Sequence, residues 1–256
     1  MCLMAFAWQT GGHPLILLGN RDEFHARPTR PAGFWTQDGL PDLLAGKDLE
    51  AGGTWLGVTR QGRFAALTNI RAPGARQGPQ SRGALALDYL AGDQDPLSYL
   101  RDLQTRRDQF AGFNLLIGDL DQLWHFNSQS NELRSLAPGI YGLSNASLDS
   151  DWPKVRQLRE NLATHLDAGA NLLLDLLGDA HVYADAELPQ TGVSLEWERL
   201  LSATFISGED YGTRASSLLK LDRQGGIIFV ERRFGPMGTS LGESCWHLAG
   251  ESDQRP

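Results

Sequence analysis

Short apolar runs separated by glycine-containing turns occupy much of the first 70 residues, and this pattern is typical of β-strands. Residues 3–8 and 14–19 surround a Thr10-Gly11-Gly12 turn and predict a hairpin at the start of the chain. Residues 53–59 and 63–69 flank Arg60-Gln61-Gly62 and predict a second hairpin. The proline-containing stretch between them, residues 27–41, is expected to be a loop.

Helical patterns follow in two places. Residues 81–90 predict one helix, and Asp95-Pro96 predicts the start of the next, because proline is favoured at the first helical position. The longest pattern spans residues 151–165, where Val155, Leu158 and Leu162 recur at helical spacing, and a shorter helix is expected over residues 170–177. Further strands are expected at residues 113–118, 122–127, 139–145, 203–207, 214–221 and 226–230. This order fits two sheets packed between layers of helices.

Composition narrows the class of protein. The chain has 256 residues, of which 41% are hydrophobic and 21% charged, as in ordinary globular proteins. Its net charge of −8 argues against binding to nucleic acid or to anionic membranes. Two cysteines form no disulfide framework, and neither a signal peptide nor a transmembrane segment is found. We therefore expect a cytoplasmic protein without stable membrane insertion.

Cys2 is the most informative residue for chemistry. Excision of Met1 would leave a cysteine whose thiol nucleophile and free α-amine base belong to one residue, the arrangement found in N-terminal nucleophile hydrolases. The predicted first hairpin would hold that terminus in a sheet.

Several motifs extend along the chain in a fixed order. The stretch Asn20-Arg21-Asp22-Glu23 closes the second predicted strand. Other blocks are Gly52-Gly53-Thr54-Trp55-Leu56-Gly57, Leu67-Thr68-Asn69-Ile70-Arg71, Ser81-Arg82-Gly83, Gly112-Phe113-Asn114-Leu115-Leu116, Gly142-Leu143-Ser144-Asn145 and Tyr211-Gly212-Thr213-Arg214. Together they resemble the NRDE family, also called the transport and Golgi organisation protein 2 family. The resemblance extends from residue 1 to about residue 235, and the tail after about residue 240 carries no recognised motif.

The resemblance implies an α+β fold: a four-layer αββα sandwich of two mainly antiparallel sheets, formed by a single domain over residues 1–256. Penicillin V acylases and bile salt hydrolases are similar in fold. The resemblance to these enzymes further implies a set of catalytic residues. In that set, Cys2 is the nucleophile, and the residues around it are Arg21, Asp22, Asn69, Asn145 and Arg214. Asn69 and Asn145 match the two oxyanion-hole amides, which donate hydrogen bonds to the developing negative charge. Arg214 matches a late arginine, and a cation near a thiol lowers its pKa.

The placement of the Asn-Arg-Asp-Glu motif has two alternatives. Neighbouring residues of a regular strand point to opposite faces, so Arg21 and Asp22 face the same way only if the strand ends or bulges at the motif. In a regular strand Arg21 would instead share a face with Glu23, and Asn20 with Asp22. We expect a strand broken at the motif, with Glu23 as the alternative to Asp22.

Two functions are compatible with these residues. The first is hydrolysis of a linear, non-peptide amide bond by the Cys2 thiolate, which needs no cofactor. The second, implied by the resemblance, is non-enzymatic haem binding and trafficking, or acyl-CoA and lipid handling, in the same cleft. Cys2 or His25 would then approach the haem iron. The expected ligand is a small amide, acyl compound or haem. The histidines show no metal-ligand spacing, and neither the substrate nor the oligomeric state follows from the sequence.

Overall fold

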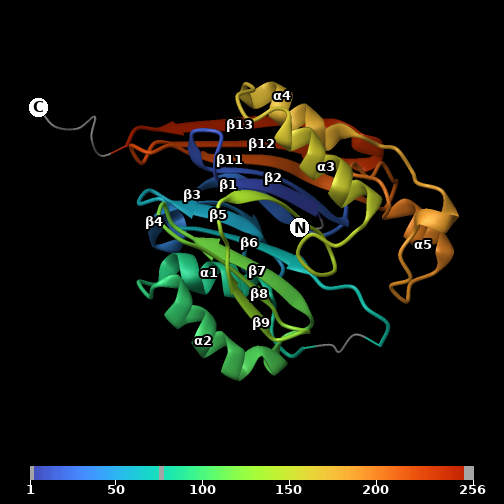
Figure 1. The fold of residues 1–256 in the computed structure, drawn as a ribbon, viewed down its shortest axis with the longest axis horizontal. Helices are drawn as coiled ribbons and strands as arrows, with labels where there is room; N and C mark the ends of the chain where they lie inside the picture. The colour runs from blue at the N-terminus through green and yellow to red at the C-terminus, as the bar shows by residue number, and fades with distance from the viewer. Residues whose placement is uncertain (1–2, 75–77, 251–256) are drawn as a thin grey trace, which may run out of the picture.

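Two antiparallel sheets lie face to face in the computed structural model, which describes residues 3–74 and 78–250 (Figure 1). The first sheet contains, in spatial order, β10 (Gly139–Leu143), β1 (Leu3–Thr10), β2 (His13–Phe24), β11 (Tyr211–Leu221), β12 (Ile227–Phe234) and β13 (Ser240–Leu248). The second contains β3 (Thr29–Trp35), β4 (Leu40–Asp48), β5 (Leu56–Thr59), β6 (Phe64–Asn69), β7 (Phe113–Gly118), β8 (Leu123–Asn127) and β9 (Glu132–Ser135).

Helices cover the outer face of each sheet (Figure 1). The second sheet is covered by α1 (Gly83–Ala91) and α2 (Pro96–Arg106), and the first by α3 (Pro153–Ala163) and α4 (Ala170–Asp175). A short helix, α5 (Leu195–Leu200), lies beyond one end of the first sheet. Single 3-10 turns occur at Thr36–Asp38, Arg107–Gln109, Leu176–Gly178, Asp185–Glu187 and Pro236–Gly238. The predicted αββα sandwich is confirmed.

The side-chain alternation of β2 shows how the sequence produces these layers. Leu15 and Leu17 enter the core between the two sheets, whereas Ile16 and Leu18 pack with the helices on the outer face. All four are fully buried. Each such side chain contributes about 1.5–3 kcal/mol relative to an exposed position, so both faces of β2 hold the layers together.

Some local predictions were wrong. The expected loop at residues 27–41 instead contains β3 and the start of β4. β3 is the edge strand of its sheet, and an edge position tolerates Pro31 because a missing amide hydrogen is harmless there. The expected strand at residues 203–207 is irregular backbone, fixed by hydrogen bonds such as Phe205 N to Asp179 O at 2.7 Å. Strands β9 and β13 and helix α5 were not anticipated. The part of the tail that forms β13 pairs with β12.

None of the helices in residues 3–74 and 78–250 is long and apolar enough to cross a membrane.

We predict that Gly53→Ala destabilises the fold by about 3 kcal/mol. A Cβ atom at Gly53 would lie 2.3 Å from the carbonyl carbon of Gly83, where α1 begins, and backbone has little freedom to move away. The free energy of unfolding in urea measures the effect. Gly33→Ala is the control, since no atom lies within 4 Å of its new Cβ. Equal effects of the two substitutions would contradict the prediction.

Candidate functional site

The Asn-Arg-Asp-Glu motif lies at the end of β2, which continues unbroken through Phe24. The expected strand break is therefore wrong. The irregularity is in the neighbouring strand β11, where Thr213 pairs with Asp22 and Ala215 pairs with Arg21, so that Arg214 is the extra residue of a bulge. Because β2 stays regular, Arg21 and Asp22 point to opposite faces.

A cavity of about 480 Å³ opens beside Arg21. We call it the polar cavity. Its lining includes Arg21, Glu23, Arg27, Asp48, Glu50, Trp55, Asn69 and Arg82. Arg21 and Glu23 thus share this cavity, as the alternative for a regular strand predicts. Asp22 does not line it.

Arg21 extends from the first sheet to the second. Its guanidinium lies 4.3 Å from the ring centroid of Trp55 and donates to Thr29 Oγ1 at 3.2 Å, and its Nη2 lies 3.5 Å from Asp48 Oδ2. Only 4% of Arg21 is exposed. Stacking and charge-assisted hydrogen bonds at a buried site keep the guanidinium in a single position.

Asp48 is the shared carboxylate of this cavity wall. Arg27 Nε donates to Asp48 Oδ2 at 2.6 Å, and the amides of Glu50 and Ala51 donate to Asp48 Oδ1 at 3.0 Å. Burial acts to raise the pKa of Asp48, but the hydrogen bonds from Arg27 and the Ala51 amide outweigh it, so the pKa is lowered. Asp48 is therefore ionised at neutral pH and balances the arginines.

A second cavity of about 340 Å³ adjoins the first, and both are lined by Asn69 and Arg82. We call it the apolar cavity. Its lining also includes Ile70, Arg71, Ala72, Asn145, Thr191, Gly192, Val193, Leu201 and Tyr211. Asn145 Nδ2 donates to the carbonyl oxygen of Asn69 at 2.8 Å, and Arg71 N donates to the carbonyl oxygen of Asn145 at 2.8 Å. The two asparagines expected to form an oxyanion hole are thus brought together.

Asn114 fixes the backbone on which this pair depends. Its Nδ2 donates to Thr68 Oγ1 at 3.1 Å and to the carbonyl oxygens of Ser144 and Ala146 at 3.4 and 2.7 Å. Thr68 Oγ1 also donates to the Ser144 carbonyl at 2.7 Å. Asn114 is fully buried, so these bonds join β6 and β7 to the Asn145 loop in a low-dielectric environment.

His125 completes this network as a neutral donor. Carbonyl oxygens accept from Asn114 Nδ2, so Asn114 Oδ1 must face His125 Nε2, 3.1 Å away, and that nitrogen carries the proton. Asn127 Nδ2 donates to the same oxygen at 3.0 Å. Burial, with a smaller effect of Arg134, lowers the pKa of His125 to about 4.

Asp22 and Arg214 lie outside the linings of both cavities. Thr213 Oγ1 donates to Asp22 Oδ1 at 2.7 Å and accepts from Ile206 N at 2.9 Å. Arg214 Nη1 donates to the carbonyl oxygens of Phe24 and Arg27 at 2.8 and 3.0 Å. Burial lowers the pKa of Arg214, and Glu23 opposes this effect. Both residues therefore support the turn after β2 and its neighbour strand.

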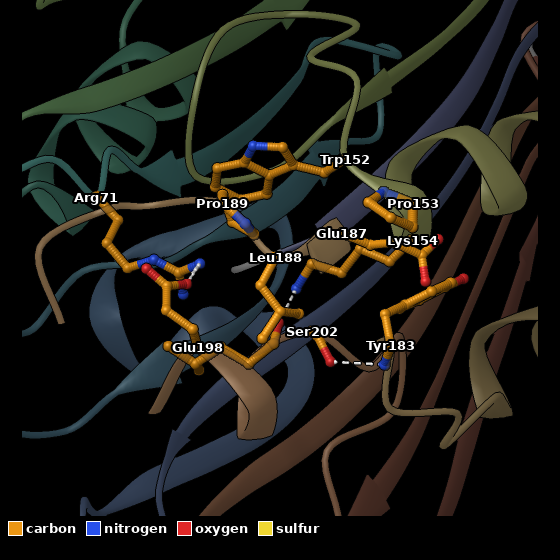
Figure 2. Close-up of a pocket in the computed structure, with 11 residues that line it drawn as sticks. Arg71, Trp152, Pro153, Lys154, Tyr183, Glu187, Leu188, Pro189, Glu198 and Ser202 are labelled. Atoms are coloured by element: carbon orange, nitrogen blue, oxygen red, sulfur yellow. Dashed lines mark hydrogen bonds and ion pairs between the residues drawn. The ribbon is translucent and has the colours of Figure 1, made fainter. Parts of the chain in front are cut away.

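Sequence reasoning gave no role to Glu198 and Lys154, which line a small pocket beside the apolar cavity (Figure 2). Arg71 and Leu201 line both. Glu198 Oε1 accepts from Thr191 N and Oγ1 at 2.7 and 2.6 Å, and its Oε2 accepts from Arg71 Nη2 at 3.2 Å. Lys154 Nζ donates to the carbonyl oxygen of Leu201 at 2.7 Å. Both charged residues are buried, a property that their local sequence does not reveal.

Cys2 lies outside the described residues. β1 begins at Leu3, which pairs with Asn20, next to Arg21. In the described part of the chain, no group of three or more histidine, cysteine, aspartate or glutamate residues is arranged to hold a metal ion.

Comparison with solved structures identifies the fold. A conjugated bile acid hydrolase from Clostridium perfringens, solved as a cysteine-to-alanine variant, is similar with a TM-score of 0.53 at 9% sequence identity. The match covers 99% of this chain and 93% of that one. At this identity the likeness shows only a shared fold, that of the N-terminal nucleophile hydrolases.

Sequence comparison identifies the family. The family described as Transport and Golgi organisation 2 matches residues 1–236. The Transport and Golgi organization protein 2 homologs of Bos taurus and Homo sapiens are each 33% identical, over 91% of this chain and 92% of theirs. The Drosophila melanogaster protein is 29% identical over 90% of this chain and 91% of its own. The chain belongs to the Transport and Golgi organisation 2 family, as its motifs predicted.

The lowered pKa of His125 predicts a pH-dependent stability. Between about pH 6.5 and pH 4, the unfolded chain binds a proton at this residue and the folded protein does not. The free energy of unfolding therefore falls as the pH is lowered through that window, by about 3 kcal/mol for this residue, and its contribution levels off below pH 4. Urea unfolding at several pH values measures the difference between wild type and His125→Gln. Parallel pH profiles would show that His125 is not the group responsible.

Proposed function

We propose that this protein is a cysteine amidohydrolase that cleaves linear, non-peptide amide bonds. The observation that supports it most is the presence of Arg21 and Asn69 on one cavity, beside the point where β1 begins at Leu3. Cys2 directly precedes Leu3 in the chain, and successive Cα atoms are about 3.8 Å apart.

The proposed reaction has two steps. The α-amine of Cys2 takes the thiol proton, and the thiolate attacks the amide carbon. The resulting oxyanion accepts hydrogen bonds from the side-chain amides of Asn69 and Asn145. The amine then leaves with the proton from the Cys2 α-amine, and a thioester remains. Water then hydrolyses the thioester. This step releases a carboxylic acid and regenerates the Cys2 thiol.

The supporting residues act on charge and position. Arg21 follows Asn20, the strand partner of Leu3, and a cation near the Cys2 thiol would favour the thiolate. Asp22 and Arg214 were expected in the catalytic set, and we propose that they are positioning residues, which act through the backbone that they support. Asn114 holds the Asn145 loop and the end of β6, so it positions both proposed oxyanion donors.

Haem binding is the competing hypothesis, and it predicts different behaviour. A haem carrier shows no amide turnover. Its binding of hemin, measured by titration with ultraviolet–visible absorbance, persists in Cys2→Ser unless Cys2 is the axial ligand. Running this titration beside an amidase screen separates the two functions.

We predict that Cys2 reacts faster than Cys245 with a small alkylating reagent at pH 7, because reactivity follows the thiolate fraction. Cys245 is exposed, but partial burial and the charge of Glu243 raise the pKa of its thiol. Peptide mass spectrometry over time measures both rates, in a preparation whose intact mass shows that Met1 is removed. Cys2→Ser should lower amide turnover by orders of magnitude without changing Tm. If the preparation without Met1 turns over no class of acyl amide, the proposed enzymatic function is refuted.

Asn145→Ala should lower kcat about 10²- to 10³-fold, the usual cost of removing one oxyanion donor. Its hydrogen bond to Asn69 is worth only about 1 kcal/mol, so the variant should remain folded. Steady-state kinetics and thermal melting measure the two effects. If KM rises and kcat is unchanged, Asn145 contacts the substrate without stabilising the transition state.

A further inference from the structure

The two cavities that meet at Asn69 and Arg82 differ sharply in chemistry. The polar cavity carries three carboxylates, those of Glu23, Asp48 and Glu50, together with the arginines described above. The apolar cavity has no carboxylate in its lining and carries five apolar or aromatic side chains: Ile70, Ala72, Val193, Leu201 and Tyr211. Its two arginines are Arg71, which is paired with Glu198, and Arg82, at the junction with the polar cavity. A ligand that spans Asn69 therefore meets a charged environment on one side and a largely apolar one on the other.

The wall of the apolar cavity is preformed. The Glu198 carboxylate holds Thr191 and Arg71 together, and Arg71 stacks over Trp152 at 5.3 Å from its ring centroid. Gly192 has a φ of +92°, and a Cβ there would lie 2.8 Å from the Cα of Pro73. The loops around Pro73 and Gly192 are therefore in close contact, and their residues Ala72 and Gly192 both line the apolar cavity.

An apolar surface continues outward from this cavity. The rings of Phe24, Trp197 and Tyr211 contact one another, with centroid distances of 5.1 to 6.2 Å. Tyr211 lines the cavity, while Phe24 and Trp197 are 49% and 36% exposed. Val193, also a lining residue, is 39% exposed. Single exposed apolar residues are ordinary, but a cluster that adjoins a pocket is typical of a binding site.

We propose that the site takes an amphipathic amide in one orientation. The apolar acyl chain occupies the apolar cavity and ends on the rings of Phe24, Trp197 and Tyr211, and the polar amine portion occupies the polar cavity. The carbonyl carbon then lies at Asn69, where the cavities meet. Cleavage of the bond at this point rests on the proposed function, whereas the binding orientation does not.

The volumes set the scale of the acyl group. An apolar cavity of about 340 Å³ has room for about ten non-hydrogen atoms, at the roughly 30 Å³ that a water molecule occupies in the liquid. Its size falls within the range of small-molecule pockets. We therefore expect binding to strengthen as the acyl chain grows to about ten carbons, because each methylene group leaves water.

Binding of N-decanoylglycine and N-butanoylglycine to Cys2→Ala, measured by calorimetry at pH 7, tests this inference without interference from turnover. We expect the decanoyl compound to bind at least tenfold more tightly, with a more negative heat-capacity change. Val193→Asp, made in the same background, should remove most of this advantage. Val182→Asp is the matched control, because Val182 is 51% exposed and lines neither cavity. It should change neither affinity.

A carboxylate substitution in the polar cavity tests the orientation. Glu50 is 61% exposed and lines the polar cavity, which takes the amine side. Glu50→Lys should therefore change the affinity for N-decanoylglycine by at least threefold. The affinity for neutral N-decanoylethylamine should stay within twofold.

Equal affinity for both chain lengths, or equal effects of Val193→Asp and Val182→Asp, would overturn the inference. If binding depends on chain length but the wild type shows no turnover, the proposed hydrolase function is refuted and the proposed binding orientation stands. Turnover that is independent of chain length would refute this inference alone.

Discussion

The architecture of the site depends on one buried cation that crosses between the sheets. Arg21 starts on β2 of the first sheet, yet its guanidinium contacts Trp55, Thr29 and Asp48, which belong to the second sheet or the segments next to it. A buried arginine requires partners at several of its donors, so these contacts fix how the two sheets approach each other at this end of the sandwich.

Glu231 makes a similar connection from β12, where its carboxylate accepts from the amide of Ala32 on β3 at 2.8 Å. Burial raises the pKa of Glu231, and the Ala32 amide and nearby arginines oppose that effect. The sheets are thus joined by apolar packing along most of their length and by charged groups where the cavities open.

Polar networks also explain why the two adjoining cavities keep their shapes. Asn114 joins two strands of the second sheet to the Asn145 loop, and Glu198 joins the Thr191 loop to Arg71. Each uses one side chain to satisfy several backbone or side-chain groups in a dry environment, so removing either leaves more than one partner unpaired. Loops form part of the cavity walls, and buried polar side chains hold those loops in position.

The sequence predicted the layers and the family more completely than it predicted the site. Alternation along β2 was sufficient to show that Arg21 shares a face with Glu23 if the strand is regular, and the structure adopts that alternative. The order of the motifs predicted that Asn69 and Asn145 would meet, and the Asn145 side chain bonds to the Asn69 carbonyl oxygen across 76 positions of the chain. The roles of Asn114 and Glu198 were not predictable, because each acts through partners far along the chain, 127 positions away for Glu198 and Arg71. Local propensity misjudged β3 because Pro31 lies on an edge strand, a property of the assembled sheet.

The order of strands in the first sheet has a consequence for biosynthesis. β1 pairs with β10, and β2 pairs with β11, so the N-terminal hairpin lies between partners that are synthesised 131 to 206 residues later. At about 5–20 residues per second, the hairpin waits roughly ten seconds or more for β11, with the apolar residues of both faces uncovered. Such long-range pairing makes folding slow and exposes the nascent chain to aggregation. The second sheet has no such delay, because its strands pair in sequence order. We therefore expect the nascent chain to form the second sheet first and to depend on chaperones until the last quarter of the chain has emerged.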